Sequence, residues 1–302
     1  MSLIALHFAS GAAFFTGTAC LLVGVLVVTR RRGRFASAVG RLLILLGVFA
    51  VVISASPLPV WAYGIWLASL VAWGTTSART KPPKRLWRTM GLVSCVGWSL
   101  MAVSWELSYQ LPPRPPPGQW QRLVVVGDSL SAEDFTEGGD PWPKRLARDH
   151  RIRVDNLAFS GAQSASAAKR IADDDLSGAL VILEIGGNDL LGAIAADDFE
   201  RGLDRLLSLV CRDDNAVVML ELPLPPLYNR YGEVQRRLAG QYRVSLIPKR
   251  YFAGVFAGST ATIDSLHLSA VGHRKMADMI WTFVAPAISD SAHPTPHPAF
   301  PP

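Results

Sequence analysis

The sequence predicts a chain in two parts, a membrane-spanning helical region followed by an α/β domain with a parallel β-sheet. Three observations predict this organisation. Long apolar runs fill residues 1–110, basic residues gather in the short segments between those runs, and beyond residue 121 short apolar runs alternate with segments of helical spacing. Alternating strands and helices form a parallel sheet with helices on both faces.

The N-terminal part contains four apolar runs. Residues 3–28 contain no Lys, Arg, Asp or Glu, and a helix of about 20 residues is enough to cross the hydrocarbon core of a membrane. Pro57 and Pro59 break the helical pattern between the second and third runs. The expected spans are residues 3–28, 38–56, 58–76 and 89–109. Because the second run is short, three spans are the alternative.

Charge is distributed unevenly between the two parts. Residues 1–118 contain 11 Lys/Arg and one acidic residue, whereas residues 119–302 contain 19 Lys/Arg and 23 Asp/Glu. The excess lies mainly in residues 30–41 and 79–88, which flank the runs, and short basic loops stay in the cytoplasm. This pattern predicts a multi-pass protein of the cytoplasmic (inner) membrane with its C-terminal domain on the extracytoplasmic side. It gives no reason to expect a nucleic-acid partner.

Composition also sets the boundaries of the parts. Half of the residues are hydrophobic and 18% are charged, which excludes a disordered or coiled-coil chain. We expect a membrane region at 1–110, a folded domain at 122–287 and a disordered, Pro-, Ser- and His-rich tail at 288–302. Residues 111–121, LPPRPPPGQWQ, are dense in proline and predict a short, stiff linker.

The C-terminal part contains five short apolar runs that suit strands buried on both faces. They are residues 122–126, 152–157, 179–185, 216–222 and 243–247. Helical spacing appears between them, and Ser269 is a suitable N-cap for the last helix. In parallel sheets ligands bind beyond the carboxyl ends of the strands, so chemistry is expected just after these runs.

Short polar signatures follow four of the five runs. Gly127-Asp128-Ser129-Leu130 follows the first run, and a loop containing Gly161 follows the second. Gly186-Gly187-Asn188-Asp189 follows the third run, and Asp264-Ser265-Leu266-His267 comes after the last.

Together these four blocks resemble the SGNH hydrolases, also called GDSL lipases and esterases, over about residues 122–286. The stretch DSLHLSAVGHRKMAD is typical of the C-terminal end of this family, and the domain looks most like its bacterial thioesterase/lysophospholipase branch. The resemblance implies a three-layer α/β/α, flavodoxin-like sandwich with a five-stranded parallel sheet. It also implies a carboxylic ester hydrolase and leaves the substrate open.

Ester hydrolysis needs a nucleophile, a base and donors for the oxyanion. Ser129 is the expected nucleophile, which a base must activate. His267 is the expected base, and Asp264, three residues earlier, could orient its imidazole as the third member of a triad. By the family pattern, the oxyanion is held by the backbone N–H groups of Ser129 and Gly161 and by the amide of Asn188.

The remaining expectations concern neighbouring residues and partners. Leu227 and Tyr228 are candidates for an acyl-binding wall, although the loop containing them could equally be a rigid connection. Leu190 is a second candidate wall. We expect Asp128 and Asp189 to brace loops and His273 to be solvated. No ligand spacing for a metal and no phosphate-binding loop is found, so no metal or cofactor is predicted.

An extracytoplasmic site near the membrane favours a lipid or envelope-linked ester as substrate. Two alternatives stay open. The first is an acyl- or acetyltransferase, or a deacetylase, acting on envelope polysaccharide, and the second is a non-catalytic binding module. Neither the oligomeric state nor the acyl length follows from the sequence.

Overall fold

A computed structural model describes residues 1–30, 33–78, 85–114, 116, 118–132, 139–258, 260–264 and 267–288. The chain forms two units, each described here by itself. The first comprises Met1–Pro112, Glu221–Arg237 and Pro248–Ala257, and the second comprises Pro113–Leu220, Leu238–Ile247 and Gly258–Pro302.

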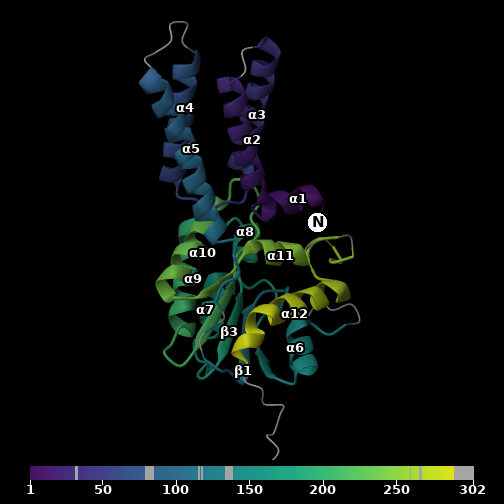
Figure 1. The fold of residues 1–302 in the computed structure, drawn as a ribbon. Coiled ribbons are helices and arrows are strands. Elements are labelled where there is room, and N and C mark those ends of the chain that lie inside the picture. Colours follow the sequence, from purple (N-terminus) through teal and green to yellow (C-terminus); the bar gives the residue numbers. More distant parts are fainter. Residues whose placement is uncertain are drawn as a thin grey trace, which may run out of the picture. The chain divides into compact units, whose positions relative to one another are not determined.

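Five helices form the N-terminal part of the first unit (Figure 1). They are α1 (Leu3–Ala9), α2 (Ala12–Arg30), α3 (Arg34–Ile53), α4 (Val60–Ala78) and α5 (Arg85–Ser108). The run at 3–28 therefore divides into two helices, which differs from the single span predicted. The break lies at Ser10 and Gly11, and Gly11 has a φ of +83° that favours glycine.

Among the described residues, three helices are long and apolar enough to cross a membrane. They are Ala12–Arg30, Arg34–Ile53 and Leu86–Ser108. α4 has 19 residues and no charged side chain, and it packs along α5. The count of four spans therefore stays a prediction.

Glycines allow α2 and α3 to pack closely. A Cβ on Gly24 would lie 2.6 Å from the carbonyl oxygen of Gly40, and a Cβ on Gly47 would lie 2.6 Å from that of Gly17. Small residues at such contacts let apolar helices approach each other. α4 and α5 are joined by a hydrogen bond of 3.1 Å from Trp66 Nε1 to Ser99 Oγ.

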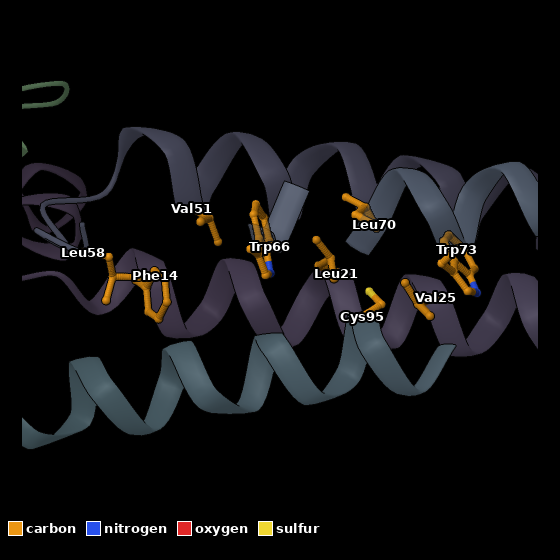
Figure 2. Close-up of a cluster of buried hydrophobic side chains, with 9 residues drawn as sticks. All are labelled: Phe14, Leu21, Val25, Val51, Leu58, Trp66, Leu70, Trp73 and Cys95. Carbon is orange, nitrogen blue, oxygen red and sulfur yellow. The ribbon is translucent and has the colours of Figure 1, made fainter. Parts of the chain in front are cut away.

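A buried apolar cluster connects these helices (Figure 2). Its members come from α2, from α3, from α4 with the segment before it, and from α5. They are Phe14, Leu21, Val25, Val51, Leu58, Trp66, Leu70, Trp73 and Cys95.

The second unit is built on a five-stranded sheet in which every pairing is parallel. The strands are β1 (Arg122–Gly127), β2 (Arg153–Asn156), β3 (Leu180–Glu184), β4 (Ala216–Leu220) and β5 (Ser245–Ile247), in the order β2-β1-β3-β4-β5. β3 and β4 are buried along their whole length, as expected for central strands covered on both faces. The predicted α/β class with a five-stranded parallel sheet is confirmed, and the observed strand order is the flavodoxin-like one.

Two pairs of helices flank the sheet (Figure 1). α6 (Trp142–His150) packs against α12 (Ala270–Val284), and α7 (Ser164–Arg170) packs against α9 (Ala196–Val210). The apolar residues of α9 recur at helical spacing and are buried, which places one face of α9 in the core. The predicted N-cap of α12 is confirmed, since Ser269 Oγ accepts from the Gly272 N–H at 3.2 Å. The short helices α8 (Gly187–Leu191) and η1 (Ala285–Ala287) complete the unit.

Two stretches of the domain predicted at 122–287 belong instead to the first unit. One contains the start of α10 (Asn229–Tyr242) and the other contains α11 (Lys249–Val255). They are joined to α5 by a buried network in which Glu106 and Glu221 alternate with Arg236 and Lys249. Of the predicted tail, Ile288 forms a bridge with Trp120, and residues 289–302 lie outside the described residues.

Candidate active site

Ser129 lies on the turn that directly follows β1. Asp128 Oδ1 accepts the Leu130 N–H at 2.9 Å, and the Asp128 carbonyl accepts the N–H groups of Ser131 and Ala132 at 3.0 and 2.9 Å. The serine is therefore held on a closed turn at the carboxyl end of a central strand. This is the position that the sequence predicts for it.

The loop containing Gly161 lies beside the same strand end. The Phe159 N–H donates to the carbonyl oxygen of Gly127 at 3.2 Å, which attaches the loop to the end of β1. Gly161 has a φ of +77°, which favours glycine at this position. The structure thus brings the loops after β1 and β2 to one edge of the sheet.

Asn188 lies on α8, after β3. Its Nδ2 donates to the Ala162 carbonyl at 3.1 Å, which joins the third block directly to the second. A Cβ on the preceding Gly187 would lie 3.1 Å from Asp128 Oδ2, which shows how closely the third block approaches the first. Three of the four predicted blocks therefore meet.

Asp264 and His267 are paired in the loop before α12. His267 Nδ1 lies 2.7 Å from Asp264 Oδ2, and the His267 backbone N–H donates to Asp264 Oδ1 at 2.8 Å. A bridge between Thr262 and Leu268 closes the loop around them. The carboxylate thereby orients the imidazole, as the sequence spacing predicts. Ser265 and Leu266 lie outside the described residues.

Acidic side chains brace this edge of the sheet. Asp189 accepts from the backbone N–H and the hydroxyl of Ser164 at 2.9 and 2.7 Å. Burial raises the pKa of Asp189, and burial raises the pKa of Asp128 to about 6 while the charge of nearby His267 lowers it. These contacts agree with the bracing expected for both aspartates.

Sequence reasoning missed one acidic residue at this edge, Glu184, the last residue of β3. It is buried and bonds to the turn that contains Ser129. A signal for it existed, because Glu184 is the one charged residue in the apolar run 179–185. A buried carboxyl group in a central strand requires specific hydrogen-bonding partners.

The candidate substrate-binding residues fall in different units. Leu190, on α8, belongs to the second unit and is half-buried. Leu227 and Tyr228 are exposed and belong to the first unit, where Leu227 lines a cavity of about 370 Å³ together with Val52 and Tyr63. A role for any of them in binding substrate stays a prediction.

Two further findings concern the remaining sequence expectations. His273 is buried on α12, so the expectation that it is solvated was wrong. Its place on the inward face of the helix explains the burial. Within the described residues, no group of three or more His, Cys, Asp or Glu side chains is arranged to hold a metal ion.

Comparison with known proteins identifies the domain. The model of the GDSL-like Lipase/Acylhydrolase family matches residues 125–275, which is half of the chain. The chain belongs to this family. Its second unit has the SGNH-type fold, and the chain is a hydrolase of the carboxylic ester class.

Several known proteins are similar to this chain. Esterase TesA of Pseudomonas aeruginosa is 29% identical over 182 residues, covering 56% of this chain and 90% of the relative. Thioesterase 1/protease 1/lysophospholipase L1 of Escherichia coli is 27% identical over 135 residues, covering 42% of this chain and 65% of the relative. A crystal structure of TesA matches with a TM-score of 0.49 and 26% identity, covering 56% of this chain and 100% of that chain.

Proposed function

We propose that the protein is a membrane-anchored serine ester hydrolase in which Ser129, His267 and Asp264 form a catalytic triad. The observation that carries the proposal is the Asp264–His267 pair. One carboxylate bonds both the ring and the backbone of the histidine, at 2.7 and 2.8 Å. With Nδ1–H donated to Asp264, the lone pair of the neutral imidazole is on Nε2, the nitrogen that acts as general base in such triads.

The reaction proceeds by acyl transfer to the serine. His267 removes the Ser129 hydroxyl proton as Ser129 Oγ attacks the ester carbonyl, and then returns that proton to the leaving alcohol. A water molecule, activated by the same imidazole, releases the acid from the acyl-enzyme. Asp264 remains ionised and stabilises the imidazolium.

The developing oxyanion is held by the backbone N–H groups of Ser129 and Gly161 and by the Asn188 amide. The hydrogen bond from Asn188 to Ala162, beside Gly161, supports this assignment because it ties two of the three donors to one loop. Losing one such donor costs about 2.7–4 kcal/mol of transition-state stabilisation.

Membrane anchorage is supported by the surface of the apolar helices. On α3, Leu42, Leu45 and Phe49 are exposed, and α3 carries no charged residue after Arg41. Large apolar side chains gathered on an exposed helical surface indicate contact with lipid. By the distribution of basic residues, the catalytic domain lies on the extracytoplasmic side of the cytoplasmic membrane.

A catalytic site on the extracytoplasmic side of the membrane meets lipid esters rather than cytoplasmic thioesters. The relative from Escherichia coli is named as both a thioesterase and a lysophospholipase, and the membrane location favours the second of these activities. We therefore propose a lipid or envelope-linked ester, with lysophospholipids as the first class to assay.

The test is turnover by the full chain in detergent. Ser129→Ala and His267→Gln should each lower kcat/KM for p-nitrophenyl esters by about 10⁴-fold or more. Ser208→Ala, which removes an exposed hydroxyl on α9, is the matched control and should leave kcat/KM unchanged. Equal activity of Ser129→Ala and the unmodified protein would refute the proposed nucleophile.

A further inference from the structure

Glu184 is buried beneath the turn of the candidate nucleophile. It ends β3, its residue is 1% exposed, and it lies opposite Gly127 in the register of β1 and β3. The charged residue that acts most strongly on it is Asp128, another acid. A buried carboxylate beside a second carboxylate is strongly disfavoured as an anion.

The hydrogen bonds of Glu184 all reach the residues around Ser129. Its Oε2 accepts the Ser131 hydroxyl at 2.8 Å and the Asp128 backbone N–H at 3.3 Å. These two bonds tie one buried oxygen to residues on either side of Ser129.

Burial beside a second acid favours the protonated form of Glu184. Burial and the adjacent Asp128 raise the pKa of Glu184 well above its usual range, whereas burial raises that of Asp128 only to about 6. The other charged groups that act on Asp128 are His267, which lowers its pKa, and Asp189, which raises it.

Neighbouring groups pack closely against the turn and against Asp128. A Cβ on Gly127 would lie 2.7 Å from Ser131 Oγ, and one on Gly187 would lie 3.1 Å from Asp128 Oδ2. Ser131 Oγ also accepts the Trp142 indole N–H at 3.1 Å. This hydroxyl therefore links α6 to Glu184. The turn is therefore held from both sides.

We propose that Glu184 is a positioning residue for the nucleophile: its buried carboxyl group accepts from the Ser131 hydroxyl and the Asp128 backbone N–H, and so fixes the turn that presents Ser129. The inference rests on the proposed function, because it needs Ser129 to be the reacting group. Glu184 itself contacts no reacting atom. Its effect on catalysis is therefore on kcat rather than on KM.

Glutamine tests this role because its amide oxygen can accept the same two hydrogen bonds, whereas alanine can accept neither. In the full chain, Glu184→Gln should keep kcat/KM within threefold of the unmodified protein. Glu184→Ala should lower kcat at least tenfold with KM unchanged. A Glu184→Gln enzyme as slow as Glu184→Ala, or a Glu184→Ala enzyme of full activity, would overturn the proposal.

The pH dependence of unfolding gives a readout that does not need activity. Because the pKa of Glu184 is raised in the folded protein, its stabilising contribution is present at low pH and is lost as pH rises through the folded pKa. Between pH 6 and 8 the Tm should fall more in the unmodified protein than in Glu184→Gln. Equal slopes would contradict the burial of Glu184 beside Asp128, on which its positioning role depends, even if Glu184→Ala failed to fold.

A control distinguishes this residue from an ionised glutamate. Glu221 accepts Arg236 Nε at 2.7 Å and belongs to a buried ion network, so Glu221→Gln should lower the Tm markedly where Glu184→Gln does not. Failure of the proposed function can be distinguished from failure of the positioning role, because Ser129→Ala would then keep full activity.

Discussion

Replacing Glu106 with glutamine should destabilise the first unit by about 3–5 kcal/mol, the usual cost of removing one partner of a buried ion pair. Glu106 has no exposed surface. Its two oxygens accept Arg236 Nη1 and Nη2 at 2.6 and 2.9 Å, and Oε1 also accepts Lys249 Nζ at 3.0 Å. Glutamine keeps the shape and removes the charge, which leaves two buried cations with Glu221 alone.

The effect is large enough to measure in the full chain. A change of 3–5 kcal/mol corresponds to roughly a hundred-fold to a few-thousand-fold change in the ratio of folded to unfolded protein. The assay is unfolding in mixed detergent micelles, followed by tryptophan fluorescence, since Trp66 and Trp73 lie in the core of this unit.

Glu233→Gln supplies the matched control. Glu233 pairs with the exposed Arg230 at 3.4 Å, and a pair of this kind contributes about 0–1 kcal/mol. If Glu106→Gln is no more destabilising than Glu233→Gln, the network does not hold α5 to α10 and α11, and the reasoning is refuted.

Three further predictions follow from other contacts. A fragment beginning at Gln119 lacks Glu106, so it should show a lower Tm and less helix by circular dichroism than the same segment within the full chain; a fragment as stable as the full chain would contradict this. Gly47→Ala should lower stability by about 1–3 kcal/mol through overpacking against α2, whereas Gly64→Ala, where a Cβ would contact nothing, should not; equal unfolding midpoints would contradict the close packing. Burial, with the charge of Arg145, lowers the pKa of His273 to about 4; because the unfolded value is near 6.5, its stabilising contribution is present above that pH and is lost as pH falls toward 4. The unmodified protein should therefore lose up to about 3 kcal/mol relative to His273→Gln over that window, and parallel pH–stability curves would show that His273 titrates normally.

Local pattern in the sequence predicted most of the second unit. The five apolar runs became the five strands, because central strands of a parallel sheet are buried on both faces and need continuous apolar sequence. The spacing of Asp264 and His267 predicted their pairing for a similar reason, since residues three apart in a tight loop are within reach of one hydrogen bond.

Contacts between distant parts of the chain were not predictable in this way. Glu106 is a single acid at the end of an apolar run, and its partners lie 130 and 143 residues further along. Glu184 is likewise a lone acid whose partners belong to another block of the sequence. The sequence shows that such residues are unusual, but only the fold brings their partners to them.

Chemical labelling of Ser129 tests the central claim most directly. The full chain in detergent is treated with a fluorophosphonate, which forms a covalent bond only with an activated serine, and the adduct is located by mass spectrometry. We predict one adduct, on Ser129, that His267→Gln abolishes together with ester turnover. An adduct on a different serine, or ester turnover that persists with Ser129 unlabelled, would contradict the account.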